Sequence, residues 1–300
     1  MAILNARETR KRLQSLRLEQ KSGFGFAFQE KAVHLGYDWH SHTRHQLLYS
    51  FSGRIILRSR NARWLLPPQR AAWIPAGTRH QTTLDRAETV SVFFKSIPRG
   101  FQVEDIRVIR ANPLLREMLL HSSRWPANEC PPRKDKILGQ SFFETLALLC
   151  VDWIQQELPF RLPASRDASV QKAVDHLLNH LDSATIKTAA HTSAQSVRTL
   201  RRRFLPATGL TWQQYALHAR LLQAMDTLLT TKRSVLEVAY SVGYNSPSAF
   251  AKAFTRFTGS TPLVFRKSRL GESPMAGNRS SLKKDWHSSP RLVNHKPPFS

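Results

Sequence analysis

Two stretches of sequence decide the fold, Ser196–Gly209 (SVRTLRRRFLPATG) and Ser246–Gly259 (SPSAFAKAFTRFTG). They share an apolar frame fifty residues apart, in which Phe204 corresponds to Phe254. The correspondence continues on both sides and pairs Ile186 with Leu236, Ala189 with Ala239 and Tyr215 with Phe265. A repeat with a preserved apolar frame predicts one supersecondary unit that is used twice.

The first copy predicts a helix with an apolar inner stripe and a basic outer face. Ser196 can cap its N-terminus, because a serine hydroxyl accepts a hydrogen bond from a free amide of the first turn. Leu200 and Phe204 then follow at helical spacing. Arg198 and Arg202 fall off that stripe, one turn apart and side by side.

Each copy has the layout of a helix-turn-helix, in which a leading helix and a tight turn precede the second helix. The first unit is predicted at about 185–206, with a leading helix over Ile186–Thr192. The second is predicted at about 235–257, with a leading helix over Val235–Val242.

A single, largely apolar helix is predicted between the two units, over Thr211–Thr230. Its length of roughly 28 Å is close to the ~34 Å between successive major grooves on one face of DNA. One rigid helix could therefore hold two DNA-reading units about one duplex turn apart.

Two long motifs resemble the AraC/XylS family of bacterial transcription regulators. Gly209–Ala224 (GLTWQQYALHARLLQA) is similar to the family's linking helix, and Val235–Pro262 is similar to its second signature. The resemblance covers about 168–270 and implies an all-α double helix-turn-helix domain that enters adjacent major grooves of double-stranded DNA. Two positions depart from the pattern: Gln195 stands in a turn position that is usually apolar, and Pro206 follows the first recognition helix early.

The resemblance also implies DNA contacts by position. Base reading is expected from Arg198, Arg202, Ser248 and Lys252. The two arginines are the stronger candidates, because an arginine can grip guanine O6 and N7 with two hydrogen bonds. Phosphate contacts are expected from Arg201, Arg203, Ser196, Ser246 and Arg256.

The charge of the chain fits a polyanionic partner. The 300 residues include 45 Lys and Arg against 21 Asp and Glu, a formal net charge of +24. Basic residues displace condensed counterions from nucleic-acid phosphates. A solvated basic surface explains part of the excess, but residues 168–270 alone carry 14 basic and 4 acidic side chains.

The N-terminal part, about 22–105, predicts a small all-β barrel. Short β-rich runs alternate with turn signals such as Gly53 and Pro67–Pro68. The expected strands are Phe24–Phe28, Leu47–Phe51, Arg54–Arg58, Arg63–Leu65, Ala71–Ile74, Thr89–Phe94 and Gly100–Phe101.

Histidines in this barrel resemble the cupin pattern, HxHxxxE followed by PxGxxH. They stand at His40, His42 and His80, while Gln46 replaces the glutamate. Because His40 and His42 point to the same side of a strand, a third histidine could complete a site for Zn, Fe, Mn or Ni. An amide is a poorer metal ligand than a carboxylate. Three interpretations stay open: a pocket for an organic effector with hydrogen-bonding histidines, a metal-assisted pocket, and structural histidines.

Aromatic residues are expected to line the pocket, because concave sites are mostly apolar with few polar groups. The candidates are Trp39, Tyr49, Phe51, Trp64, Trp73 and Phe94, although any one of them could simply fill the barrel. The residues expected to meet the effector are His40, His42, Gln46, Tyr49, Trp73 and His80. The run Trp64–Gly77 resembles a subset of AraC-type regulators with such a sensor barrel.

Helices are predicted over 106–159, where Asn112 caps a first helix with Pro113 in its first turn. A long apolar helix follows over Lys134–Leu158, and its apolar surface is wider than a small barrel needs. We expect part of it to form a homodimer interface, with intramolecular packing as the alternative.

The remaining segments are polar. We expect 1–21 to be a mobile basic arm, 160–167 to be an interdomain linker and 271–300 to be disordered. No apolar run reaches the roughly 20 residues that span a bilayer, and the N-terminus has no apolar region of signal type. Cys130 and Cys150 have no CxxC partner that would indicate zinc or a disulfide framework. A cytoplasmic protein without a membrane partner is the simplest expectation.

These observations favour a non-enzymatic, sequence-specific transcription regulator that responds to a small-molecule effector. The resemblance implies an activator that works with RNA polymerase. No cofactor is expected, with a divalent metal in the cupin-like pocket as the alternative. The rival interpretation is a cupin-type metal-dependent enzyme with a basic DNA-binding appendage, and Gln46 argues against it. A third is an architectural DNA-binding protein without a sensor role.

Overall fold

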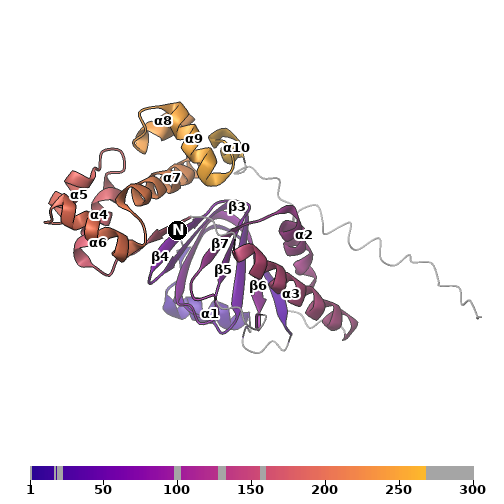
Figure 1. Cartoon of the computed structure of the whole chain (residues 1–300). Helices are drawn as coiled ribbons and strands as arrows, with labels where there is room; N and C mark the ends of the chain where they lie inside the picture. Colours follow the sequence, from indigo (N-terminus) through magenta and orange to yellow (C-terminus); the bar gives the residue numbers. More distant parts are fainter. Residues whose placement is uncertain are drawn as a thin grey trace, which may run out of the picture.

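A computed structural model describes residues 2–16, 18, 23–97, 103–127, 133–155 and 160–267. The chain forms a β-sheet domain with flanking helices and an all-α domain against one end of the sheet (Figure 1). This arrangement confirms the predicted fold class. The predicted strand Gly100–Phe101, the predicted disordered tail 271–300 and Cys130 lie outside the described residues.

Three long strands form the centre of the sheet. β2 (Gly25–His40) and β3 (His45–Ser59) each pair antiparallel with β6 (His80–Phe94), which lies between them. β4 and β5 pair with the two halves of β3, while β1 runs parallel to β2, β7 pairs with β5 and β8 with β4. The shorter strands are β1 (Ala2–Ile3), β4 (Ala62–Leu66), β5 (Arg70–Ile74), β7 (Arg107–Arg110) and β8 (Arg161–Pro163).

The sequence predicted short strands where the structure has long ones. The runs Leu47–Phe51 and Arg54–Arg58 belong to one strand, β3, and Gly53 between them is a bulge rather than a turn. A Cβ atom at Gly53 would lie 2.1 Å from the Arg86 carbonyl oxygen, so only glycine fits at this point of the pairing between β3 and β6. The middle of β2 buries no side chain fully, which explains its weak apolar signal.

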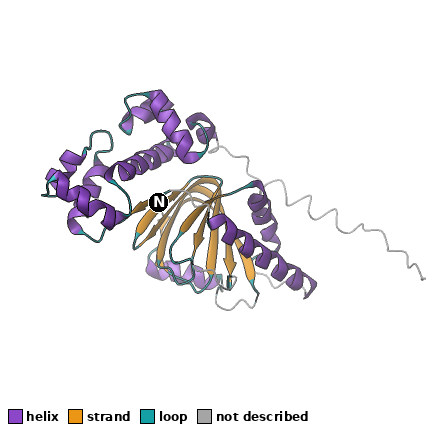
Figure 2. Ribbon diagram, viewed as in Figure 1, coloured by secondary structure: helices purple, strands orange, loops and turns teal. Residues whose placement is uncertain are grey.

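Helices α2 (Pro113–His121) and α3 (Arg133–Ile154) cover one face of the sheet (Figure 2). Asn112 caps α2 as predicted and accepts a hydrogen bond from the Leu115 amide at 2.8 Å. A short helical turn, η1 (Ser122–Arg124), follows α2. The residues buried beneath these helices form one apolar cluster that includes Trp73, Phe94, Leu119, Phe143 and Leu146.

The expectation that no segment is apolar enough to span a bilayer is wrong for helix α3. By length and composition alone, Lys134–Ile154 is apolar enough to cross a bilayer, with a mean hydropathy of 1.4 in its most apolar window. In the structure it is a sheet-covering helix, because Phe143 and Cys150 are buried in the cluster beneath it. Its outer face carries exposed apolar residues: Ile137, Leu138 and Leu148.

The N-terminal segment contains a docked helix, whereas the sequence predicted a mobile arm. α1 (Ala6–Ser15) begins with a capping box, in which Asn5 and Glu8 each accept a hydrogen bond from the other's backbone amide. Arg12 of α1 forms an ion pair with Glu30 of β2, which ties the helix to the sheet. The many charged residues of this segment predicted a solvent-exposed arm. A charged helix can nevertheless dock through a few buried groups, and the sequence does not show which groups these are.

Seven helices of the described chain form the C-terminal domain. Most of them begin at a Ser, Thr or Asp side chain that caps the first turn. They are α4 (Ala168–Asn179), α5 (Ile186–Thr192), α6 (Val197–Thr208), α7 (Trp212–Thr230), α8 (Val235–Ser241), α9 (Pro247–Thr258) and α10 (Pro262–Lys267).

The two helix-turn-helix units repeat with two different offsets. The second helices α6 and α9 are fifty residues apart, with N-caps at Ser196 and Ser246. The leading helices α5 and α8 are forty-nine residues apart, with N-caps at Thr185 and Ser234. The second turn is therefore one residue longer. Two predicted pairings are wrong by one residue: Ile186 with Leu236 and Ala189 with Ala239.

The predicted linker 160–167 is partly built into the sheet. Phe160 is fully buried, and β8 pairs with β4 through Leu162 opposite Arg63. Pro163 does not prevent this pairing, because an edge strand tolerates a residue without an amide proton. The segment therefore attaches the C-terminal domain to the sheet.

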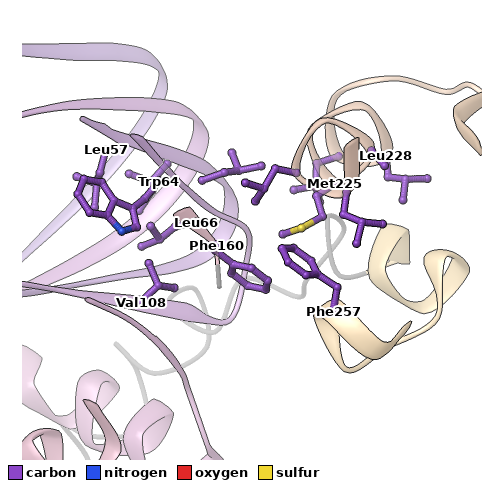
Figure 3. Packing of buried hydrophobic residues seen from close by; sticks show 14 of the residues in the cluster. Leu57, Trp64, Leu66, Val108, Phe160, Met225, Leu228 and Phe257 are labelled. Atoms are coloured by element: carbon purple, nitrogen blue, oxygen red, sulfur yellow. The ribbon is translucent and has the colours of Figure 1, made fainter. Parts of the chain in front are cut away.

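One apolar cluster crosses from the sheet to the C-terminal domain (Figure 3). Trp64 and Leu66 of β4 belong to it, as does Met225 of α7. The Phe160 ring lies between the two sides, with its centroid 5.3 Å from that of Phe257 in α9. The second helix-turn-helix unit and the sheet domain therefore share a core.

Two arginines of the sheet domain add polar contacts beside this shared core. Arg54 forms ion pairs with Asp85 of β6, at 2.8 Å, and with Asp226 of α7. Arg70 donates a hydrogen bond of 2.9 Å to the carbonyl of Thr258, at the C-terminal end of α9. A cation is favourable at that end of a helix, where the unpaired carbonyl groups carry partial negative charge.

Candidate DNA interface and effector pocket

Helix α6 presents a basic surface to solvent. Leu200 and Phe204 are fully buried and fix the inner face of the helix. Arg198, Arg201 and Arg202 are exposed, and none of them forms an ion pair with another described residue. Their charges are therefore available to a polyanion.

Arg203 is engaged elsewhere, which revises the expectation of a phosphate contact. Its Nε and Nη2 atoms lie 2.8 and 2.6 Å from the Asp167 carboxylate. Asp167 also caps α4 by accepting from the Ser169 and Val170 amides. Partial burial opposes ionisation of Asp167, but the hydrogen bonds from Val170 and Arg203 outweigh it and lower its pKa. Arg203 thus joins α6 to α4.

Helix α9 has a weaker basic surface. Ser248, Lys252 and Arg256 are exposed on it, and the two basic residues form no ion pair with described residues. The hydroxyls of Ser246 and, in α6, Ser196 are used as N-caps. A phosphate contact at these two positions stays a prediction, and the amides of the first turn are its better donors.

The turn of the first unit contains a side-chain amide without a hydrogen-bond partner, that of Gln195. Gln195 occupies the place that Tyr244 takes in the second unit, since each follows a residue with positive φ, Ala194 at 53° and Gly243 at 83°. Both polar atoms of the Gln195 side chain are buried without a hydrogen-bond partner. Gln195 is therefore unfavourable where the family pattern has an apolar residue, because buried unpaired amides destabilise a fold.

A cavity of about 580 Å³ opens at the end of the sheet domain where α1 lies. It is lined by α1 residues such as Arg10 and Leu13, by Trp39, and by the two histidines His40 and His42. A smaller hollow of about 40 Å³ shares both histidines and continues between the apolar side chains of the sheet interior. The larger cavity, with its volume of about 580 Å³, suits a small organic molecule.

The structure brings the three predicted histidines together. The ring centroids of His40 and His80 are 4.2 Å apart, and those of His42 and His80 are 5.3 Å apart. The Nδ1 atoms bond to the carbonyl oxygens of Asp38, Arg44 and Thr78, at 2.7, 2.6 and 2.9 Å respectively. A carbonyl can only accept, so each Nδ1 carries a proton.

Burial keeps two of these rings neutral. It lowers the pKa of His40 to about 4, and it lowers the pKa of His80 well below the usual value. In a neutral ring with a proton on Nδ1, Nε2 is an acceptor. The Nε2 atom of His80 is buried without a hydrogen-bond partner. The pocket therefore has an acceptor-rich inner end.

A metal ion does not fit this arrangement as it stands. Nε2 of His42 donates to Oε1 of Gln46 at 3.0 Å, while the Gln46 nitrogen donates to Ser91 at 2.8 Å, so this Nε2 offers no lone pair to a metal. Among the described residues, no group of three or more His, Cys, Asp or Glu is placed to hold a metal. The histidines are better explained as hydrogen-bonding groups.

Two predicted effector contacts, Tyr49 and Trp73, are on the wrong face. Successive side chains of a strand alternate between faces. Gln46 and Leu48 line the inner hollow, so Tyr49 lies beneath α2 and α3 in the outer cluster, where Trp73 also packs. Of the aromatic candidates, Phe51 and Phe94 share that cluster, Trp64 packs toward α7, and Trp39 lines the cavity.

Two basic residues of the cavity, Arg10 and Arg79, were not predicted from the sequence. Arg10 belongs to the segment interpreted as a solvated arm. Arg79 precedes His80, and this adjacency to the second histidine motif was the signal available in the sequence.

Two family models match the chain in the order that this architecture requires. Residues 27–123 match the AraC-like ligand binding domain, and residues 188–268 match the helix-turn-helix domain. Together the two matches cover more than half of the chain. The chain belongs to the AraC family of transcription regulators. Its AraC-like domain supplies Trp39, the two lining histidines and Arg79 to the cavity, whose lining outside this domain comes from α1 and Leu18, and its helix-turn-helix domain holds α6 and α9.

Named relatives of this AraC-family regulator are HTH-type transcriptional regulators as well. The HTH-type transcriptional regulator NimR of Escherichia coli (strain K12) is 26% identical over 225 residues, 74% of this chain and 80% of NimR. RipA of Corynebacterium glutamicum is 35% identical over 112 residues, and the activator RhaR of Salmonella dublin is 34% identical over 107. The chain spans about a third of the length of these last two, 33% and 38%.

Solved structures resemble parts of the chain. The DNA-binding domain of AdpA, solved with a target DNA, is 36% identical and covers 33% of this chain and 91% of its own, with a TM-score of 0.32. ToxT from Vibrio cholerae O395 is 14% identical and covers 83% of this chain and 98% of its own, with a TM-score of 0.36.

Proposed function

We propose that this AraC-family regulator binds a specific operator through α6 and α9, and that a small organic effector in the 580 Å³ cavity controls this binding. The observation that supports the proposal is the pair of exposed basic second helices, held by α7 in the same chain as the cavity.

Footprinting on the DNA upstream of the protein's own gene tests this proposal. We expect protection over two adjacent major grooves, and we expect metabolite pools to change it. Protection without sequence preference, and without any response to the pools, would instead indicate an architectural DNA-binding protein.

Base reading is proposed for Arg198 and Arg202 of α6, with Ser248 and Lys252 of α9 as weaker counterparts. All four side chains are exposed on the outer faces of their helices. Arginine is suited to guanine, whereas serine and lysine discriminate less between bases. Phosphate contacts are proposed for Arg201 and Arg256 and for the N-termini of both helices.

The route from cavity to DNA is proposed to run through the shared core. Leu48 and Leu84 line the inner hollow and belong to the apolar cluster that reaches Met225 of α7. Asp85 follows Leu84 in β6 and holds Arg54, which holds Asp226 of α7. A ligand that displaces Leu84 would therefore change the position of the second helix-turn-helix unit.

Dimer formation is proposed through the outer face of α3. Ile137, Leu138 and Leu148 are 66%, 48% and 57% exposed there. Covering large apolar side chains lowers the free energy of the protein, so this face favours contact with a second copy. Sedimentation of the full chain should show a dimer at micromolar concentration, and Leu148→Glu should shift it to monomer. A monomeric parent protein, on and off DNA, would contradict this proposal.

Further partners are proposed from the family and its relatives. We infer that the protein acts in the cytoplasm as an activator that works with RNA polymerase, as its similarity to the transcriptional activator RhaR suggests. In vitro transcription from the footprinted promoter should rise when protein and effector are both added. A fall in transcription would identify a repressor.

A non-enzymatic role is proposed for the sheet domain. The histidine cluster lacks the arrangement for a metal among the described residues, and the named relatives are regulators. Metal analysis and turnover assays on the purified full chain test this. Stoichiometric metal together with turnover of a small substrate would favour the cupin-type enzyme.

A further inference from the structure

The described lining of the large cavity is positively charged. Arg10 of α1 and Arg79 line it, and no Asp or Glu does. Both guanidinium groups are on exposed residues, and neither forms a hydrogen bond or an ion pair with another described residue. Because the cavity is partly enclosed by protein, this charge is screened less than on an open surface, so the site favours an anion.

The inner end of the same cavity offers acceptors instead of charge. His40 lines it, and the buried His80 lies directly behind, with ring centroids 4.2 Å apart. Both rings donate from Nδ1 to a backbone carbonyl, which leaves Nε2 as an acceptor on each. The Nε2 atom of His80 is completely buried and unpartnered. Of the two rings, His40 lines the cavity, so its Nε2 is the acceptor that a ligand with a donor can reach.

The cavity that contains both ends also has an apolar part of its wall. Its large apolar lining residues are Leu13, Leu18 and Trp39. A ligand that reaches from the arginines to His40 therefore needs a hydrocarbon body.

We propose that the effector is a hydroxylated organic carboxylate. Its carboxylate pairs with Arg10 and Arg79, and its hydroxyl donates to Nε2 of His40, which lines the cavity. This assignment deepens the proposed function and rests on it, because it names the chemical class of ligand for the same cavity. A cationic amine is disfavoured by the two arginines, and a neutral polyol leaves them without a counter-charge.

Isothermal titration calorimetry on the full chain at neutral pH tests the assignment. The probes are 6-hydroxyhexanoate, 8-hydroxyoctanoate and 10-hydroxydecanoate, each compared with its primary amide and with the acid that lacks the hydroxyl. We expect at least one hydroxy acid to bind about tenfold more tightly than its amide, the ratio typical of one charge-assisted contact. The acid without the hydroxyl should also bind more weakly.

Charge-neutral variants locate the contact. Arg79→Gln and Arg10→Gln should each weaken the hydroxy acid by about tenfold and leave its amide unchanged. Arg7→Gln is the matched control, because Arg7 is also exposed on α1 but does not line the cavity. It should bind the acid as the parent protein does.

Three outcomes would overturn the assignment: no hydroxy acid binds, the amide binds as tightly as its acid, or Arg79→Gln and Arg10→Gln bind the acid unchanged. Operator binding separates this failure from that of the proposed function. If DNA affinity responds to the neutral amides alone, the protein is ligand-responsive but the anion assignment is wrong. If the acid binds in the arginine-dependent way and DNA affinity stays constant, the ligand class is right and the regulatory role is wrong.

Discussion

The ion pair between Arg54 and Asp226 joins the two domains, and a double-mutant cycle measures its strength. The two side chains are 22% and 24% exposed, between a surface pair and a buried one. Surface pairs contribute about 0.2–1 kcal/mol, whereas breaking a buried pair costs about 3–5 kcal/mol. We therefore expect a coupling energy of about 1–2 kcal/mol between Arg54→Ala and Asp226→Ala.

The single variants should differ in cost, because Arg54 has a second partner. In Asp226→Ala, the guanidinium of Arg54 keeps Asp85 at 2.8 Å, so we expect a loss of about 1 kcal/mol. In Arg54→Ala, Asp226 loses its partner, and Asp85, with a side chain only 10% exposed, keeps His34 at 2.8 Å. The carboxylates of Asp85 and Asp226 then each lose a positively charged partner, so we expect the free energy of unfolding to fall by about 2–3 kcal/mol.

Urea unfolding of the parent, both single variants and the double variant provides the four free energies. The pair Arg203 and Asp167 is the control, because it lies within the C-terminal domain and its arginine is 42% exposed. Operator affinity of the same proteins shows whether the interdomain contact also affects DNA binding. A coupling energy near zero, or equal costs of the two single variants, would refute the proposed role of Arg54 as a bridge.

Further substitutions test three other parts of the structure. Gln195→Leu should raise the free energy of unfolding by about 1–3 kcal/mol, because it removes a buried unpaired amide, and no gain in urea unfolding would contradict this. Arg202→Ala should weaken binding to the cognate site by about 1–3 kcal/mol and relax one base preference. Arg201→Ala should mainly reduce the salt dependence of binding. If Arg202→Ala weakened binding to all DNA sequences equally in gel-shift titrations, base reading by Arg202 would be excluded. Because the pKa of His40 is lowered to about 4, the unfolded chain binds a proton there between about pH 6.5 and pH 4 that the folded chain does not. Stability should therefore fall as pH falls through this window, and less steeply in His40→Asn; identical slopes in urea unfolding would be the contrary result.

The local helical architecture was available from the sequence. The repeated stripe of Leu200 and Phe204, the cap Ser196, and the Asn112-Pro113 start all predicted helices that the structure contains. These signals act between residues three or four positions apart, so they do not depend on the rest of the fold. The histidine motif likewise predicted a cluster, because two of its members share one strand face.

Tertiary structure decided which of the exposed or buried groups meet. Alternation along a strand separates Gln46 from Tyr49 but does not say which face holds the cavity. The pairing of Arg203 with Asp167 joins residues far apart in the chain, and so does the bridge from Arg54 to Asp226. Such contacts depend on how whole helices and strands pack, because a long flexible side chain can meet any partner that packing brings within reach. The sequence by itself therefore determined the units of this protein, and their packing determined the cavity and the connection between the two domains.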